Sequence, residues 1–211
     1  MYEVLGVDVS LWNTDSAYAA KRWFDPFVAK EKGVQFAFIK ASEGKAKDPQ
    51  VEKFAQLFAD AGIPHGFYHF ARPEWSYLDQ ANVFWNIIKN FDWSLPPVLD
   101  LERQGVGLSF TKAFLGRIES KANVKPILYT SSGFWTSLNG YAEADWINEY
   151  PLWIANYKKL SFPVYGIPQN IGEPYVPKPF KRWSFWQFTP NGDGEYYGGN
   201  YDPRYENRVP V

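Results

Sequence analysis

Two acidic residues in the segment PPVLDLERQ, residues 96–104, are placed where they could act together. The segment is a short apolar run between two prolines and a glutamine–glycine pair, which is typical of a buried strand. Side chains alternate between the faces of a strand, so Asp100 and Glu102 share one face with Cα atoms roughly 6.6 Å apart. Carboxyl groups held this close raise the pKa of one of them, which leaves a protonated acid beside an ionised carboxylate, as in glycosidases. A strand end at which both acids simply reach water is the alternative for an isolated D-x-E pattern.

Other polar residues stand at or just beyond the ends of further segments that are typical of strands. They are Asp8 in residues 4–10, Lys40 near the end of residues 35–41 with Glu43 just beyond it, His69 in residues 63–72 and Tyr129 in residues 126–130. In a parallel barrel the C-terminal ends of the strands converge on one face, where catalytic groups gather. We therefore expect these side chains to surround Asp100 and Glu102.

The strand segments alternate with segments of helical periodicity, which implies a parallel sheet with right-handed crossovers. We expect longer helices over residues 16–32, from Val51 to the stop at Gly62, over 75–91 and over 109–122. The first would be capped by residues 13–15 and disturbed at Pro26, and the last would be capped by Ser109 or Thr111. Short helices are expected over 132–138 and 142–146, and later strands over 152–157, 182–189 and near 200–202. The predicted fold class is α/β, an irregular TIM-like barrel of about eight strands with helices mainly after the first five strands. A doubly wound open sheet is the alternative, but no glycine-rich loop follows the first strand to support a nucleotide site.

Composition and charge narrow the class of function. Lys+Arg 22 against Asp+Glu 23 gives a net charge of -1, so nothing draws the chain toward nucleic acid or an anionic membrane. No apolar run approaches the roughly 18 residues of a membrane span, and the N-terminal residues lack the pattern of a signal peptide. The chain contains 10 Trp, 14 Tyr and 17 Phe, more tryptophan than a core usually requires, which favours a carbohydrate ligand.

We expect neither a metal nor a cofactor. His65 and His69 are four residues apart, but on a strand this spacing spans roughly 13 Å, too far to share one ion. There is no cysteine to form a disulfide or a thiolate metal site. Residues 190–194, PNGDG, lack the spaced acids of a calcium loop and indicate a turn.

Seven segments in this order resemble glycoside hydrolase family 25, the Chalaropsis-type lysozymes or N-acetylmuramidases: GVDVS, FIKASEG, GFYHFARP, VLDLE, ILYTS, LWIANY and WQFT. The resemblance extends from about residue 6 to residue 202. It implies an irregular barrel and cleavage of the β-1,4 bond between N-acetylmuramic acid and N-acetylglucosamine in peptidoglycan. Residues 162–180 form a longer or more divergent loop than the family pattern leads us to expect.

The resemblance also implies roles for individual residues. Glu102 matches the general acid, Asp100 the other acid of the D-x-E, Asp8 the first-strand aspartate and Asp202, whose flanks differ from the family pattern, the last-strand aspartate. The expected substrate-binding residues are Lys40, Glu43, Tyr68, His69, Tyr129, Trp153 and Gln187.

Two routes remain open for Asp100. It could attack the anomeric carbon, or it could orient the 2-acetamido group of the substrate to attack instead. The likeness of a D-x-E on a barrel strand to chitinase-type sites favours the second route, but the spacing alone fits both.

We expect a monomer that acts on peptidoglycan glycan strands of the bacterial cell wall as a single catalytic domain over residues 1–211, without a separate cell-wall-binding domain. The absence of a leader fits a phage-encoded protein or one released by another route. The alternative is a catalytically weak or inactive peptidoglycan-binding module, or a phage structural module of the same fold.

Overall fold

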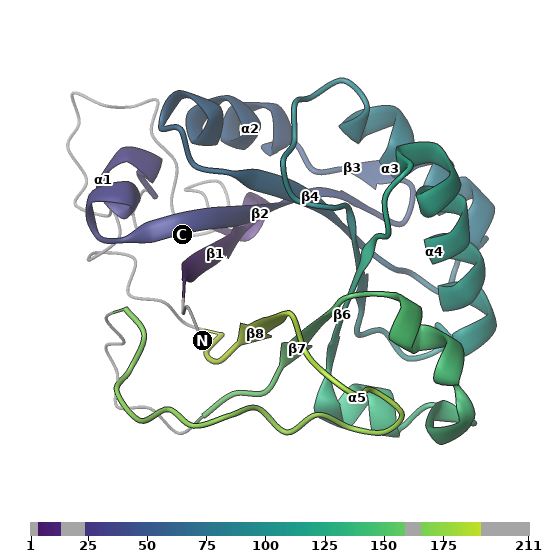
Figure 1. Ribbon diagram of the computed structural model, residues 1–211. Helices are drawn as coiled ribbons and strands as arrows, with labels where there is room; N and C mark the ends of the chain where they lie inside the picture. The colour runs from purple at the N-terminus through teal and green to yellow at the C-terminus, as the bar shows by residue number, and fades with distance from the viewer. Residues whose placement is uncertain (1–3, 14–23, 159–165, 191–211) are drawn as a thin grey trace.

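The computed structural model describes residues 4–13, 24–158 and 166–190. Its centre is a curved sheet in which seven parallel strands follow one another in chain order, as Figure 1 shows. These are β1 (Leu5–Val9), β2 (Val34–Glu43), β4 (His65–Phe70), β5 (Val98–Leu101), β6 (Ile127–Ser131), β7 (Leu152–Ala155) and β8 (Phe185–Gln187). The two-residue strand β3 (Ala46–Lys47) folds back antiparallel on β2. The predicted α/β barrel-like class is confirmed, and the sheet forms a half-barrel.

Helices connect the first five parallel strands, as the alternating pattern predicts. They are α1 (Pro26–Glu31), α2 (Val51–Asp60), α3 (Tyr77–Ile88), α4 (Leu108–Ala122) and α5 (Ser132–Thr136), with 3-10 turns η1 (Leu11–Asn13), η2 (Tyr141–Glu143) and η3 (Asp145–Glu149). In Figure 1, α2, α3 and α4 cover the convex side of the sheet. No helix in the described part of the chain has the length and apolar character needed to cross a bilayer.

The alternation of side chains along the strands separates two apolar clusters. On β5, Leu99 and Leu101 belong to the large cluster between the sheet and the helices. Val98, on the opposite face of the same strand, belongs to a smaller cluster with Phe38, Trp153 and others. The inner cluster fills the concave side of the sheet, beneath the C-terminal ends of the strands where Asp100 and Glu102 follow Val98.

Two predicted features differ in the structure, and a third cannot be compared. Within the part of the first predicted helix that the structure describes, α1 begins at Pro26, because Asp25 is its N-cap and accepts a hydrogen bond from the Phe27 amide; residues 16–23 of that prediction lie outside the described residues. Gly107, not Ser109 or Thr111, is the N-cap of α4, and the Thr111 hydroxyl instead donates to the Gly107 carbonyl. The strand expected near residues 200–202 lies outside the described residues.

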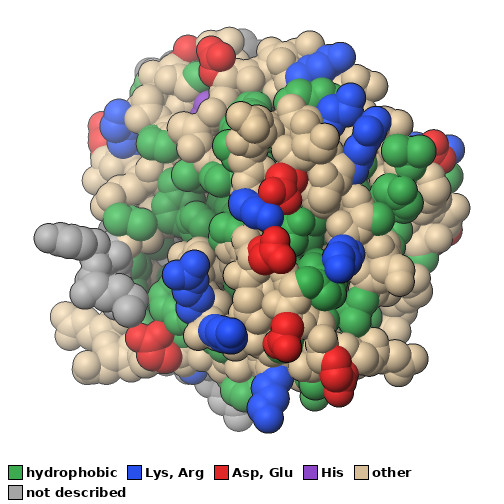
Figure 2. Space-filling model, turned by 45° about the vertical axis from the view of Figure 1, so that its right-hand side comes forward, with side chains coloured by type: hydrophobic (Ala, Val, Ile, Leu, Met, Phe, Trp, Pro, Cys, Tyr) green, Lys and Arg blue, Asp and Glu red, His purple; other side chains and the backbone are tan. Residues whose placement is uncertain are grey.

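Charged side chains do not segregate on the face shown in Figure 2. Acidic and basic groups alternate there and leave hydrophobic side chains exposed between them. This mixture agrees with the net charge of -1.

Candidate active site

Three acids gather at the C-terminal ends of the strands. Asp8 is on β1, Asp100 is on β5, and Glu102 is one residue beyond the end of β5. Burial, followed by repulsion from Glu102 and weaker repulsion from Asp8, raises the pKa of Asp100 well above its ordinary value. Burial and the charge of Asp8 also raise the pKa of Glu102, although a hydrogen bond with Tyr129 opposes them. The structure thus brings together three of the four predicted acids, and Asp202 lies outside the described residues.

One oxygen of Asp100 has no hydrogen-bond partner among the residues that the structure describes. Asp100 is 7% exposed, and the atom concerned is its buried Oδ1. A buried oxygen without a donor is unfavourable in a folded protein, and such atoms mark positions where a ligand donor can bind. The atom therefore fits the N–H or O–H group of a substrate.

Gln187, at the end of β8, connects the two ends of the curved sheet. Its Nε2 donates to Asp8 Oδ2 over 2.8 Å. Its Oε1 accepts from the Tyr129 hydroxyl at 2.7 Å and from the Tyr157 hydroxyl at 2.9 Å. Among the described residues no backbone pairing joins β1 to β8, and the hydrogen bond between Gln187 and Asp8 links these two strands through their side chains.

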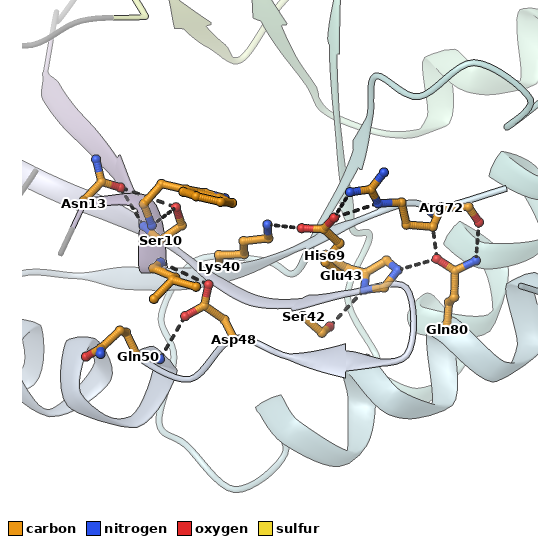
Figure 3. Close-up of polar contacts among 12 residues, drawn as sticks. Ser10, Asn13, Lys40, Ser42, Glu43, Asp48, Gln50, His69, Arg72 and Gln80 are labelled. Carbon is orange, nitrogen blue, oxygen red and sulfur yellow. Dashed lines mark hydrogen bonds and ion pairs between the residues drawn. The ribbon is translucent and has the colours of Figure 1, made fainter. Parts of the chain in front are cut away.

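Lys40 and Glu43 form a charged cluster with Arg72 (Figure 3). The charge of Lys40 acts on Asp100. Lys40 forms an ion pair with Glu43, and Arg72 donates to Glu43 Oε1 from Nε over 2.6 Å. The register of β2 on β4 shifts between Lys40 and Ser42, which lets residues three apart reach the same side. Partial burial raises the pKa of Glu43, but the hydrogen bonds from Lys40 and Arg72 outweigh it, so the pKa lies below its ordinary value.

Aromatic side chains form the layer beneath the acids. Trp153 stacks on Phe38 with ring centroids 4.6 Å apart and meets the edge of Tyr129 at 4.6 Å. Tyr68 packs against the same cluster, and burial followed by the charges of Asp8 and Asp100 raises its pKa well above the ordinary value. These three predicted substrate-binding aromatics therefore lie on the concave face together with the acids.

The predicted substrate-binding role of His69 is wrong. The side chain is 0% exposed and faces the helices, where it stacks on Phe114 with ring centroids 5.0 Å apart. Its ring nitrogens bond Ser42 Oγ at 2.9 Å and Gln80 Oε1 at 3.0 Å, as Figure 3 shows. His69 follows Tyr68 directly on β4, so the alternation of the strand sends it to the opposite face.

Sequence reasoning missed two residues of this region, Arg72 and Tyr157. Both continue the two-residue period of a strand beyond its last hydrogen-bonded pair: Arg72 follows Tyr68 and Phe70, and Tyr157 follows Trp153 and Ala155. Extending the period past the expected strand ends would have found them.

The geometry is accompanied by clear similarity to known proteins. Residues 7–195 match the family model of Glycosyl hydrolases family 25. The chain is 31% identical over 222 residues to the N,O-diacetylmuramidase of Chalaropsis, covering 93% of this chain and 92% of that protein. It is 32% identical over 213 residues to the uncharacterized protein YegX of Escherichia coli K12, covering 95% and 68%. The solved bacterial lysozyme from Streptomyces coelicolor superposes with a TM-score of 0.72 and 27% identity, covering 94% of this chain and 87% of that one.

Proposed function

This chain belongs to glycosyl hydrolase family 25, and we propose that it cleaves the β-1,4 bond between N-acetylmuramic acid and N-acetylglucosamine with Glu102 as general acid. The family makes it a peptidoglycan hydrolase of the lysozyme type that acts on the bacterial cell wall. The observation that carries the assignment of Glu102 is the gathering of Asp8, Asp100 and Glu102 at the C-terminal ends of the strands.

Glu102 is suited to proton donation. It is partly exposed, so a glycosidic oxygen can reach it, yet burial and the charge of Asp8 raise its pKa. A carboxylic acid that stays protonated toward neutral pH can protonate the leaving oxygen as the bond breaks. Asp100 is more deeply buried and less accessible to that oxygen.

Asp100 is proposed to orient the 2-acetamido group of the substrate. The unpartnered Oδ1 supports this role, because the acetamide N–H can donate to it. That bond would turn the acetamide oxygen toward the anomeric carbon for substrate-assisted attack. Asp8, held by Gln187, would tune the charge of the site, and the role of Asp202 rests on the resemblance alone.

The remaining polar and aromatic residues would bind the sugar chain. Trp153, Tyr129 and Tyr68 would support the pyranose rings from the concave face of the sheet. The ion-paired Lys40 and Glu43 would offer a donor and an acceptor to substituents of the sugars at the β2 side.

The assignment is tested by lysis of a cell-wall suspension with wild type and Glu102→Gln, followed by mass spectrometry of the fragments. We expect wild type to release reducing-end muramic acid and Glu102→Gln to lose at least 100-fold in rate, the order expected for a general acid. The matched control is Glu143→Gln, which changes an exposed glutamate on η2. We expect this variant to keep wild-type activity.

Three outcomes would contradict the proposal. Reducing-end glucosamine would identify a glucosaminidase, and activity retained by Glu102→Gln would remove Glu102 as the acid. Binding to purified peptidoglycan without release of reducing ends would indicate the binding-module alternative, which the presence of both Asp100 and Glu102 does not favour.

A further inference from the structure

We propose that Arg72 binds a carboxylate carried by the muramic acid residues of the substrate and is a specificity-determining residue of the site. This inference rests on the proposed function, because it assumes that a peptidoglycan strand lies over Asp100 and Glu102. Muramic acid differs from glucosamine by a lactyl ether. That ether ends either in a carboxylate or in an amide to a stem peptide, which has carboxylates of its own. Recognition of a carboxylate would therefore distinguish muramic acid from the other sugar of the strand.

Arg72 lies just beyond the end of β4, the strand next to the one that carries the acids. Phe70 on β4 pairs with Asp100 on β5, and the Ala71 amide continues the pairing with a 3.0 Å hydrogen bond to the Asp100 carbonyl. Arg72 and Glu102 each follow this pair by two residues, so the period of the strands puts both on the concave face. A sugar whose bond is cleaved at Glu102 therefore has its substituents within reach of a long side chain at Arg72.

Arg72 carries the accessible positive charge of its cluster. Lys40 and Arg72 both pair with Glu43, which supplies one negative charge for two positive ones. The side chain of Lys40 is 8% exposed and that of Arg72 is 26% exposed. The excess positive charge of the cluster is therefore available to a ligand at Arg72.

The end of the Arg72 guanidinium is left for a ligand. Its Nε donates to Glu43 Oε1 over 2.6 Å, and Nη2 donates to the same oxygen. A guanidinium has five N–H groups, and within the described part of the chain only these two are bonded. Figure 3 shows the other terminal nitrogen pointing away from Glu43. One N–H from each terminal nitrogen can therefore bind the two oxygens of a carboxylate in parallel.

The Arg72 side chain is held in place before any ligand binds. Gln80, which is 0% exposed, accepts from the Arg72 amide at 2.9 Å and donates to the Arg72 carbonyl over 2.7 Å. The guanidinium lies over the ring of Phe70, with its Cζ atom 5.2 Å from the ring centroid. A Cβ atom on Gly44 would lie 3.3 Å from Arg72 Cγ, so the stem of the side chain packs on the turn after β2. A side chain fixed in this way loses little conformational entropy on binding.

An acidic substituent needs a cation at this site. Asp8, Asp100 and Glu102 gather at the same strand ends, and in their ionised forms they would repel another carboxylate. Arg72 offsets this repulsion for a carboxylate that contacts it, and it gives no comparable gain to a neutral amide. The structure therefore predicts that the enzyme prefers a carboxylate to an amide at this position.

The test compares three forms of the same glycan strands. The first form carries its stem peptides, and the second is stripped of them by an amidase, which leaves free lactyl carboxylates. The third is stripped and then coupled to methylamine, so that its lactyl groups are neutral. We expect wild type to show a kcat/KM about 10-fold higher on a carboxylate-bearing form than on the neutral form, mainly through a lower KM. Arg72→Gln should lose this preference.

The same three substrates identify the source of the carboxylate. A lactyl carboxylate as the ligand makes the stripped strands better than the methylamidated ones. A stem-peptide carboxylate makes the intact strands better than both other forms. In either case Arg72→Gln must remove the difference. The proposal is overturned if wild type shows no preference, if Arg72→Gln keeps it, or if Arg72→Gln loses the same factor on all three forms, which would indicate a purely structural role.

Arg103→Gln is the matched control. Arg103 is exposed and directly follows Glu102, so its substitution removes the same charge near the site but from the opposite face. We expect this variant to keep the wild-type preference. A loss equal to that of Arg72→Gln would mean that overall charge sets the preference, which contradicts the proposal.

A second substitution keeps the proposal testable if thermal unfolding shows that Arg72→Gln is not folded. Arg72→Lys retains the charge, but a lysine cannot offer two parallel N–H groups to a carboxylate. The preference for the carboxylate-bearing form should therefore fall. An unchanged preference in Arg72→Lys overturns the proposed contact.

Failure of this inference is distinguishable from failure of the proposed function. If wild type releases reducing-end muramic acid and Glu102→Gln is inactive while Arg72→Gln keeps the preference, the function holds and the carboxylate contact does not. If wild type hydrolyses none of the three forms, the proposed function fails and this inference fails with it.

Discussion

At the scale of single residues, burial decides what a titratable side chain can do. On the helix side of the sheet, His69 has two hydrogen-bond partners and an aromatic neighbour. None of these three side chains carries a negative charge that would stabilise a protonated imidazole. Burial lowers its pKa to about 4, even though the bond with Gln80 opposes the shift. The side chain is therefore neutral in the folded protein at any pH where the enzyme would act.

The depressed pKa of His69 predicts a loss of stability in mild acid. Below the unfolded value of about 6.5 the unfolded chain binds a proton that the folded chain does not, so the free energy of unfolding falls until the folded pKa is reached. Between pH 6.5 and about 4 the contribution of His69 amounts to about 3 kcal/mol. Denaturant unfolding at several pH values measures it, and His69→Gln should flatten the dependence over this window. An equally steep dependence in the variant would exclude His69 as its cause.

At the scale of the secondary-structure elements, the backbone of β4 at Gly66 and the segment before β5 at Leu95 lie in close contact. A Cβ atom on Gly66 would lie 2.8 Å from the Leu95 carbonyl oxygen and 2.9 Å from Leu95 Cβ. The segment before β5 therefore packs directly on β4, with the Leu95 amide bonded to the His65 carbonyl at 3.2 Å. This contact sets where β5, and with it Asp100 and Glu102, begins.

Two alanine substitutions at glycines should have opposite effects. Gly66→Ala is expected to lower the free energy of unfolding by about 1–3 kcal/mol, because the backbone of Leu95 must move. Gly116→Ala, inside α4 with nothing within 4 Å of its new Cβ, is expected to raise it by about 0.5–1 kcal/mol. Chemical denaturation compares both with wild type. A neutral Gly66→Ala would show that the strand can shift without loss.

At the scale of the whole molecule, one sheet is shared by two apolar clusters. Val98 and Leu99 are adjacent on β5, both 0% exposed, yet one packs on the concave side and the other against the helices. The site stands on the inner cluster, and the helices cover the outer one. Both clusters depend on the same strands, so disruption of either cluster also disrupts the strands on which the other packs.

A shared sheet predicts one cooperative unfolding transition. Val98→Ala and Leu99→Ala should both lower the melting temperature of the same single transition, and Leu99→Ala should cost about 2–5 kcal/mol. Differential scanning calorimetry follows this directly. A second transition appearing in either variant would mean that the concave side unfolds separately.

The family-like segments of the sequence were enough to predict the parallel strands, their order and the face that Asp100 shares with Glu102. The two-residue period of a strand and the convergence of parallel strand ends are general rules, and both can be applied to short segments of sequence. Asp25 as the start of α1 was missed, because capping depends on which of several suitable residues meets the right backbone angles. Only the tertiary structure decided that His69 faces the helices and that Gln187 on the last described strand meets Asp8 on the first, 179 residues away. Such partners depend on the curvature of the whole sheet, and no local pattern encodes that curvature.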